Sequence, residues 1–249
     1  MGLLLDAAYL GAGLLASPWL LFKLASDRRF RHRLGERFGG LPTSGDGGPL
    51  VWFHAASVGE VNLVKPLIAR LRVSRPSFRF LVTSNTIAGR ENAEKSFPGV
   101  PAAYFPLDLS WAGARALKRV RPAAVVLVEL EVWPNFAQAC ARRGIPLAVI
   151  NGRVTERSFR RYRRFRGIFG PAFRSLAAVG AQSEESAARL RDLGASPVVT
   201  GNLKFDASIV FDPVEEERRW RSLLGLGDAP VLVGGSTHEP EERILAETY

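Results

Sequence analysis

Short apolar runs alternate along the chain with longer segments in which apolar residues recur at helical spacing. Runs rich in β-branched and aromatic residues are typical of strands, and they occur at residues 50–54, 78–83, 102–105, 123–128, 147–150, 176–180 and 198–200. Helical patterns follow them at residues 61–71, 87–96, 111–120, 136–143, 155–174 and 184–193. Strands that are almost continuously apolar belong to parallel sheets covered on both faces. The pattern therefore predicts an α/β, Rossmann-like domain.

A second unit of the same kind is predicted to begin near the end of the sequence. After a crossover at residues 206–213, we expect a charged helix at 215–224, a strand at 229–234 and a helix at 241–247. A strand, a polar turn and a helix in this order open a Rossmann-like unit. We interpret the sequence as one complete domain followed by the truncated start of a second.

The N-terminal residues predict attachment to a membrane. Leu3–Phe22 is mostly apolar, interrupted by Asp6 and Pro18, and about 20 residues suffice to cross a bilayer. Basic residues follow at positions 23, 28, 29, 31, 33 and 37, and none precedes the stretch. Because such an excess marks the cytoplasmic flank of a membrane helix, we expect the body of the protein in the cytoplasm. A helix that lies flat on the membrane is the alternative, favoured by Asp6.

These patterns give a predicted domain organisation. Residues 1–38 form a membrane anchor with its basic flank, and the Gly- and Pro-rich residues 39–49 form a linker. Residues 50–206 form the complete domain, and residues 207–249 the crossover and the start of the second domain.

The composition adds a preference for anionic partners. The chain has 34 Lys and Arg against 24 Asp and Glu, a formal net charge of +10, which favours nucleic acid, an acidic membrane surface or phosphorylated ligands. A single cysteine, Cys140, excludes an internal disulfide, and scattered histidines argue against a zinc site. A basic stretch is either a solvated helix face or a contact for lipid headgroups or phosphates; its arginines are Arg157, Arg160, Arg161, Arg163, Arg164 and Arg166.

Polar residues follow each predicted strand of the first domain. The carboxyl ends of parallel strands meet at one edge of a sheet, so these turns are expected to build one site. Glu60 is the leading candidate within it, because a carboxylate is stabilised at the amino end of a helix. Ser57 and Glu60 also fit a capping box, which leaves a purely structural role open. The turns are SVGE (57–60), TSNT (83–86), PLD (106–108), ELE (129–131), NGR (151–153), AQSEES (181–186) and GNLKFD (201–206).

Six segments together resemble a known family: HAASVGE (54–60), VELEVWPN (128–135), NGR (151–153), AQSEES (181–186), TGNLKFD (200–206) and GSTHEPEE (235–242). They resemble the Kdo transferases of lipopolysaccharide synthesis, which move 3-deoxy-D-manno-octulosonic acid (Kdo) from CMP-Kdo to the lipid A precursor, lipid IVA. The resemblance implies a glycosyltransferase-B fold, in which an N-terminal domain holds the acceptor and a C-terminal domain the CMP-sugar. The family's donor-binding motifs lie further along than Tyr249, which implies that this chain is inactive alone.

The resemblance also assigns roles to individual residues. Glu60 is implied as the general base of an inverting transfer, Glu129 as support for the transition state, and Lys204 as the cation that stabilises the anionic sugar and the departing phosphate. Of the two acids Glu129 and Glu131, we expect one to face the site and the other to be solvated or paired. Without the motif, Lys204 would be interpreted as an ordinary surface lysine. Further implied contacts are Ser57, Gly59, Arg153 and Asn202, with His238 and Glu239 in the donor half.

The implied partners are CMP-Kdo, the lipid A precursor and an anionic membrane surface, at the cytoplasmic side of the inner membrane and without metal or cofactor. One alternative is another sugar-nucleotide enzyme built of two Rossmann-like domains, such as an epimerase. The apolar N-terminal stretch and the joint occurrence of WPN and GNLKFD argue against it. A second alternative is a basic membrane- or nucleic-acid-binding module. No recognition-helix or RNA-binding signature favours nucleic acid, and no G-x-G-x-x-G indicates a nicotinamide or flavin nucleotide.

Overall fold

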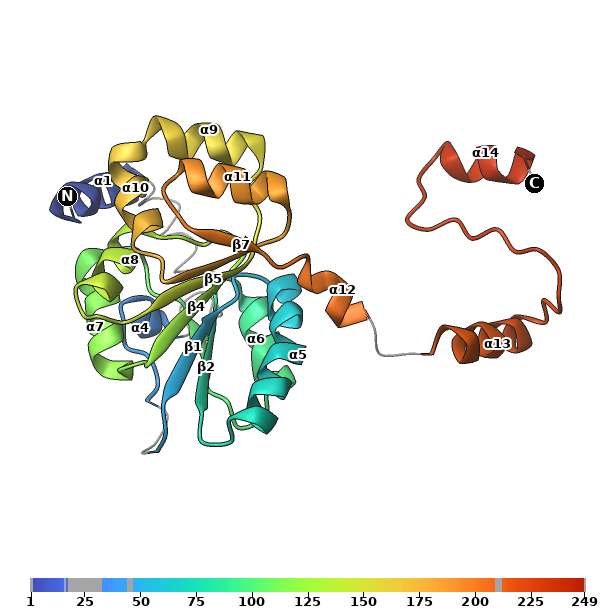
Figure 1. The fold of residues 1–249 in the computed structure, drawn as a ribbon, viewed down its shortest axis with the longest axis horizontal. Helices are drawn as coiled ribbons and strands as arrows, with labels where there is room; N and C mark the ends of the chain where they lie inside the picture. Colours follow the sequence, from blue (N-terminus) through green and yellow to red (C-terminus); the bar gives the residue numbers. More distant parts are fainter. Residues whose placement is uncertain (1, 16, 18–32, 44–46, 209–211, 249) are drawn as a thin grey trace. The chain divides into compact units, whose positions relative to one another are not determined.

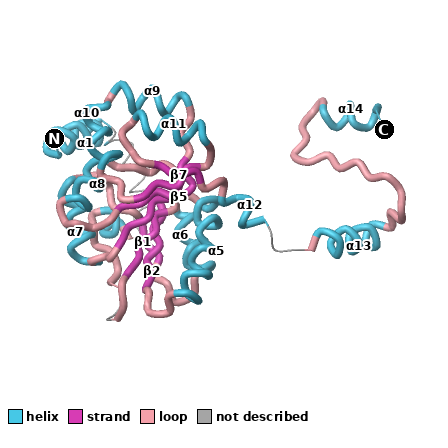
Figure 2. Tube along the Cα trace, in the orientation of Figure 1, coloured by secondary structure: helices cyan, strands magenta, loops and turns pink. Residues whose placement is uncertain are grey.

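The computed structural model describes residues 2–15, 17, 33–43, 47–208 and 212–248. The chain divides into two compact units, Met1–Ser208 and Ile209–Tyr249 (Figure 1). The first unit is a sheet with helices on both of its faces, whereas the second contains helices and irregular segments (Figure 2). The first unit therefore has the layered α/β architecture that the alternating pattern predicts.

A seven-stranded parallel sheet forms the centre of the first unit, in the order β3-β2-β1-β4-β5-β6-β7. Every predicted strand of this unit is confirmed, with ends that shift by no more than two residues. The strands are β1 Leu50–His54, β2 Arg79–Ser84, β3 Ala102–Tyr104, β4 Ala124–Val128, β5 Leu147–Gly152, β6 Ala178–Ala181 and β7 Pro197–Val199.

The two faces of the sheet carry separate apolar cores, because successive side chains of a strand point to opposite sides. In β1, Leu50 and Trp52 join the core covered by α7, α8, α10 and α11, whereas Val51 and Phe53 join the core under α5 and α6. The helices are α5 Val58–Ser74, α6 Ile87–Ser96, α7 Ser110–Val120, α8 Pro134–Ala141, α9 Glu156–Arg164, α10 Arg166–Arg174, α11 Glu184–Asp192 and α12 Leu203–Ser208.

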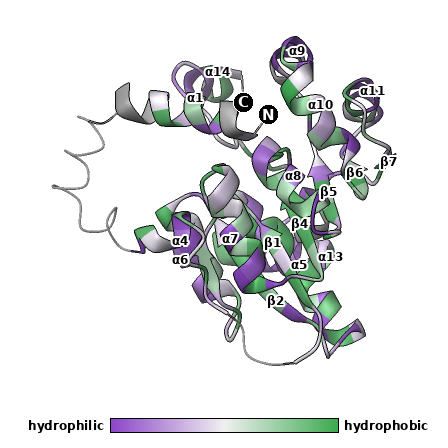
Figure 3. Cartoon of the chain, turned by 90° about the vertical axis from the view of Figure 1, so that its left-hand side faces the viewer, coloured by the Kyte–Doolittle hydropathy of each residue, from purple (hydrophilic) through white to green (hydrophobic). Residues whose placement is uncertain are grey.

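The largest differences from the predicted helix limits occur in two places. Helix α5 begins at Val58 rather than at Val61, because the Ser57 hydroxyl caps it by accepting the Glu60 N–H. The predicted basic helix 155–174 is two helices, α9 and α10, joined at Phe165. Figure 3 shows that α9 is largely hydrophilic, and Tyr162 is its buried residue.

The N-terminal segment contains helix α1, Gly2–Leu15, and the short helix α4, Leu34–Arg37. None of the helices in the described part of the chain combines the length and apolarity needed to span a bilayer. The end of the predicted membrane stretch and most of its basic flank, at residues 16 and 18–32, lie outside the described residues. The segment predicted as a linker begins within the domain, because Leu41 is fully buried in the core.

The second unit contains α13, Pro213–Leu224, and α14, Glu241–Thr248, which confirms the two predicted helices. The predicted strand at residues 229–234 is wrong: this segment is irregular and exposed. A strand needs a hydrogen-bonded neighbour, and the described residues of this unit contain no other strand. Part of the predicted crossover, residues 209–211, lies outside the described residues.

Trp52 lies at the centre of the larger core. Its side chain is fully buried, packs edge-on against Phe136 with ring centroids 5.3 Å apart, and donates a 2.8 Å hydrogen bond from Nε1 to Thr83 Oγ1. We expect Trp52→Ala to lower the free energy of unfolding by about 3–5 kcal/mol, the usual cost of a large cavity.

Urea unfolding followed by circular dichroism tests this prediction. Trp111→Ala is the matched control: this tryptophan is 49% exposed and stacks on Phe38, so the expected loss is about 1 kcal/mol or less. Equal losses in the two variants would contradict the assignment of Trp52 to the centre of the core.

Candidate active site

The candidate site lies where the order of the strands reverses. The chain builds β1, β2 and β3 in one direction along the sheet and then returns to place β4 on the other side of β1. Ligands of open α/β sheets bind at such a point, outside the carboxyl ends of the strands. The turn after β1 carries Ser57 and Glu60, and the turn after β4 carries Glu129 and Glu131. The structure therefore brings the main acidic candidates to one edge of the sheet.

Glu60 is half-buried and held by its own turn. One carboxylate oxygen accepts the Ala56 N–H at 2.8 Å, and the other accepts the Ser57 hydroxyl at 3.0 Å. Burial raises the pKa of Glu60 to about 7; the bonds from Ala56 and Ser57 oppose this rise, and the charges of Glu129 and Glu131 add to it. The predicted capping arrangement is thus present. It holds a carboxyl group that exchanges its proton near neutral pH.

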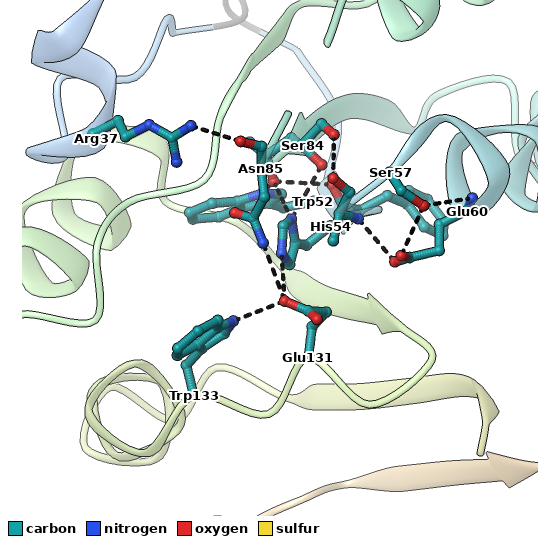
Figure 4. A network of polar contacts seen from close by, with 12 residues as sticks. Arg37, Trp52, His54, Ser57, Glu60, Ser84, Asn85, Glu131 and Trp133 are labelled. Carbon is teal, nitrogen blue, oxygen red and sulfur yellow. Dashed lines mark hydrogen bonds and ion pairs between the residues drawn. The ribbon is translucent and has the colours of Figure 1, made fainter. Parts of the chain in front are cut away.

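Glu131 is the paired acid of the two that follow β4. Its Oε2 accepts hydrogen bonds from Asn85 Nδ2 at 3.1 Å and from Trp133 Nε1 at 3.2 Å, and it lies 3.8 Å from His54 Nε2 (Figure 4). Burial alone would raise the pKa of Glu131, but His54, Trp133 and Asn85 together hold it below its usual range. Glu131 is therefore a fixed negative charge beside Glu60.

His54 completes this network from the end of β1. Its side chain is fully buried, its ring stacks on Phe105 with centroids 3.8 Å apart, and its Nδ1 lies 3.1 Å from the Thr83 carbonyl oxygen. If Nδ1 donates to that carbonyl, Nε2 faces Glu131 across a distance too long for a direct hydrogen bond. His54 was not predicted as a site residue, although its place at the end of a strand within HAASVGE was a usable signal.

Glu129 has a different environment. Its backbone adopts the left-handed conformation, with φ of 58°, which ends β4 and is uncommon for a residue with a side chain. Its N–H donates to the Ile150 carbonyl at 2.9 Å, whereas its carboxylate has no hydrogen bond or ion pair to any described residue. Of the two acids, Glu131 is therefore the paired one.

The NGR and GNLKFD motifs meet through Asn151, which sequence reasoning did not single out. Asn151 is fully buried, has φ of 55°, and accepts the Leu203 N–H on its Oδ1 at 3.0 Å. This bond places the start of α12 beside β5, and α12 in turn packs against α5. Lys204 therefore lies on a helix adjacent to the one that carries Glu60. Lys204 is exposed, and its N–H donates to Asn202 Oδ1 at 3.0 Å.

The remaining predicted contacts are distributed as follows. Ser57 and Gly59 lie in the Glu60 turn, and Arg153 is exposed after β5. His238 and Glu239 belong to the second unit, where the His238 N–H donates to the Glu241 carboxylate at 3.1 Å and its Nδ1 lies 3.1 Å from the Ser236 carbonyl oxygen. Among the described residues no group of three or more His, Cys, Asp or Glu side chains is arranged to hold a metal ion; the absence of a metal from the reaction stays a prediction.

Comparison with known proteins identifies the relatives of this arrangement. Residues 32–207 match the family model described as 3-Deoxy-D-manno-octulosonic-acid transferase (kdotransferase). The 3-deoxy-D-manno-octulosonic acid transferase of Chlamydophila psittaci is 33% identical over 252 residues, covering 97% of this chain and 57% of the relative. That of Haemophilus influenzae is 30% identical over 226 residues, covering 89% and 53%. The chain thus spans about half the length of these curated relatives.

Solved structures share the fold at low sequence identity. A UDP-GlcNAc 2-epimerase from Neisseria meningitidis, bound to UDP-GlcNAc, superimposes with a TM-score of 0.50 at 14% identity, covering 71% of this chain and 54% of the epimerase. Identity this low supports a common α/β architecture and carries no argument about the reaction.

The raised pKa of Glu60 predicts a pH dependence of stability. Its native value, about 7, exceeds the ordinary value of 4.5, so between these pH values the folded state binds more protons than the unfolded state. The contribution of Glu60 to the free energy of unfolding is fully present below pH 4.5 and is lost as the pH rises through 7. We expect the free energy of unfolding of the wild type to fall relative to that of Glu60→Gln over this interval. Glu184→Gln, at an exposed acid of the first turn of α11, should follow the wild type; a Glu60→Gln curve parallel to the wild type would contradict the shift.

The charge of Glu129 is expected to raise the pKa of Glu60 through space. Glu129→Gln removes that charge and keeps the size of the side chain, so Glu60 should ionise at a lower pH. Titration of the ¹³C carboxyl signal of Glu60 measures this directly in the protein without substrate. An unchanged midpoint would show that the two carboxylates are electrostatically independent.

Proposed function

Because the chain belongs to the 3-deoxy-D-manno-octulosonic-acid (Kdo) transferase family, we propose that it forms the acceptor-binding half of an inverting glycosyltransferase. The reaction moves Kdo from CMP-Kdo to the lipid A precursor in lipopolysaccharide synthesis, and Glu60 is its general base. The observation that carries the proposal is the position of Glu60: a half-buried carboxyl at the switch point, with a pKa of about 7. General bases work best when their pKa is close to the ambient pH.

The chemical step follows from this carboxylate. Glu60 accepts the proton of an acceptor hydroxyl while that oxygen attacks the anomeric carbon of Kdo. The bond from this carbon to the phosphate oxygen breaks, and CMP leaves with the electron pair. One displacement from the opposite face inverts the anomeric centre, so one base suffices. The hydrogen bonds from Ala56 and Ser57 keep the Glu60 carboxylate oriented during the transfer.

Two other residues supply charge during transfer. The Glu129 carboxylate, which has no partner among the described residues, supports positive charge that develops on the sugar ring. Lys204 stabilises the anionic sugar and the phosphate of the departing CMP. The role of Lys204 is supported by the packing of α12, which carries it, against α5, which carries Glu60. Ligand contacts are proposed for the residues of the same loops, Ser57, Gly59, Arg153 and Asn202.

The acceptor places the protein at a membrane surface, on the cytoplasmic side of the inner membrane. The support is the basic character of the chain and of helix α9 in particular. Of the six arginines between 157 and 166, only Arg160 forms an ion pair with a carboxylate in the described part of the chain, to Glu156 at 2.9 Å. Unpaired guanidinium groups can bind lipid headgroups and the phosphates of the lipid A precursor. The proposal includes no nucleic acid partner and no metal.

Transfer by the full gene product tests the proposal. Incubation with CMP-Kdo and lipid IVA should yield a Kdo-bearing lipid, detected by mass spectrometry. Glu60→Gln should lower the rate by about 10²–10⁴-fold, the usual contribution of a general base, because the amide cannot accept the proton. Glu91→Gln, at an exposed acid of α6 outside the polar turns, should keep the wild-type rate. Wild-type transfer by Glu60→Gln would remove the assigned base, and no transfer by the wild type would remove the proposed reaction.

A further inference from the structure

Helix α1 is joined to the domain by a buried carboxylate. Asp6 is 8% exposed, and it accepts hydrogen bonds from the Ser110 N–H at 2.9 Å, from the Ser110 hydroxyl, and from Asn135 Nδ2 at 3.0 Å. A buried carboxylate is stable only when its oxygens are satisfied. These bonds therefore fix both the rotation and the depth of α1 against α7 and α8. The same residue that interrupts the predicted membrane stretch is the point at which the helix docks.

A second polar contact lies one turn further along α1. The Tyr9 hydroxyl donates to Asp108 Oδ2 at 3.2 Å, and Asp108 also accepts the N–H groups of Asn135 at 3.2 Å and Phe136 at 2.8 Å. Asp108 thus caps the amino end of α8, directly after Trp133 and Pro134. Burial and the charge of Asp108 raise the pKa of Tyr9 to about 12, so its hydroxyl keeps the proton that it donates. Helix α1 and the loop after β4 share one anchoring point.

Tyr9 also reaches a hollow beside the candidate active site. The hollow has a volume of about 330 Å³ and is formed by α1, the loop after β4, and α9 with α10. Glu131 and Trp133 belong both to this hollow and to the network of Figure 4, so the hollow borders the polar network at the end of β1 and β4. The lining residues that determine its chemistry are Tyr9, Glu131, Trp133, Arg161, Tyr162 and Phe169.

These side chains define the class of ligand. Aromatic walls favour a ligand with an apolar face, the Glu131 carboxylate accepts hydrogen bonds from hydroxyl groups, and the guanidinium of Arg161 binds an anion such as phosphate. One sugar ring that carries a phosphate combines all three properties. The volume is at the low end of the range of about 300–1,000 Å³ that ligand pockets occupy, which suits a single ring with its substituents.

We propose that helix α1 forms one wall of an acceptor site, with Tyr9 facing Trp133 and Arg161 across a hollow that holds a phosphorylated sugar of the lipid acceptor. The inference rests on the proposed function for the identity of the acceptor. It gives the N-terminal segment a role in substrate binding that is separate from any attachment to a membrane. Asp6 and Asp108 act as positioning residues, because they hold the wall and do not line the hollow themselves.

Steady-state kinetics of the full gene product in detergent micelles test whether Tyr9 of α1 contacts the acceptor. Tyr9→Ala should raise the KM for lipid IVA about fivefold to tenfold, the loss expected for one aromatic contact together with its hydrogen bond. The KM for CMP-Kdo should stay within twofold, because the hollow holds the acceptor. Tyr9→Phe keeps the ring and should restore most of the acceptor affinity. Equal rises in the two KM values would show a general loss of structure and overturn the proposal.

Arg161 gives a second, independent test of the ligand class. Its side chain is exposed, so Arg161→Ala does not threaten folding. The variant should raise the KM for lipid IVA, and this rise should disappear with an acceptor from which the phosphates have been removed. Arg191→Ala, at an exposed arginine of α11, is the matched control and should leave both KM values unchanged. A rise that is independent of acceptor phosphate would contradict the role of Arg161.

A binding measurement separates this inference from the proposed reaction. Lipid IVA titrated into the protein without CMP-Kdo should quench the fluorescence of Trp133, identified by its loss in Trp133→Phe. Tyr9→Ala should weaken that binding. If the wild type binds lipid IVA in this way but transfers no Kdo, the proposed reaction is wrong and the assignment of the hollow as the acceptor site is retained. If quenching is absent, or is the same in Tyr9→Ala, the hollow is not the acceptor site.

Discussion

The parallel pairing of β1 with β4 is the constraint on which the site depends. Val51 to His54 run beside Ala124 to Leu127 in register, so the turns that leave these two strands must emerge at the same edge. No side chain could bring Glu60 and the acids after β4 together if either strand ran the other way. Because the chain reverses its direction across the sheet at this pair, the two turns flank the kind of point at which open α/β sheets bind ligands.

At that edge, three carboxylates have different surroundings. Glu131 is held charged by His54, Trp133 and Asn85. Burial, together with the neighbouring negative charge, makes ionisation of Glu60 less favourable. The backbone of Glu129 is left-handed, and its side chain has no partner among the described residues. Like charges at close range push the pKa values of neighbouring acids apart, and this separation is the usual basis for giving similar side chains different tasks.

Polar contacts connect helix α1 to the loop after β4. Asp108 caps α8 and accepts the Tyr9 hydroxyl, while Asn135 joins Asp6 to the same helix end. Trp133 immediately precedes α8 and reaches Glu131. A displacement of α1 would therefore shift the amino ends of α7 and α8, and with α8 the loop after β4. This connection gives a physical reason for the Trp133-Pro134-Asn135 segment: the tryptophan faces the hollow, the proline begins the helix, and the asparagine fixes it to α1.

The sequence by itself determined the sheet, its parallel strands and the edge at which the polar turns meet, because apolar periodicity and turn residues are local signals. It also predicted the capping box of Ser57 and Glu60 at the start of α5, since a capping box spans only a few residues. Tertiary structure alone decided that Glu131 is paired and Glu129 is not, that His54 faces Glu131, and that Asp6 docks α1 onto Asn135, 129 positions away. The segment 229–234 was misjudged for the same reason, because an apolar run becomes a strand only where another strand is available to pair with it. Partners that are distant in sequence leave no local pattern, so only the folded chain shows which polar group satisfies which.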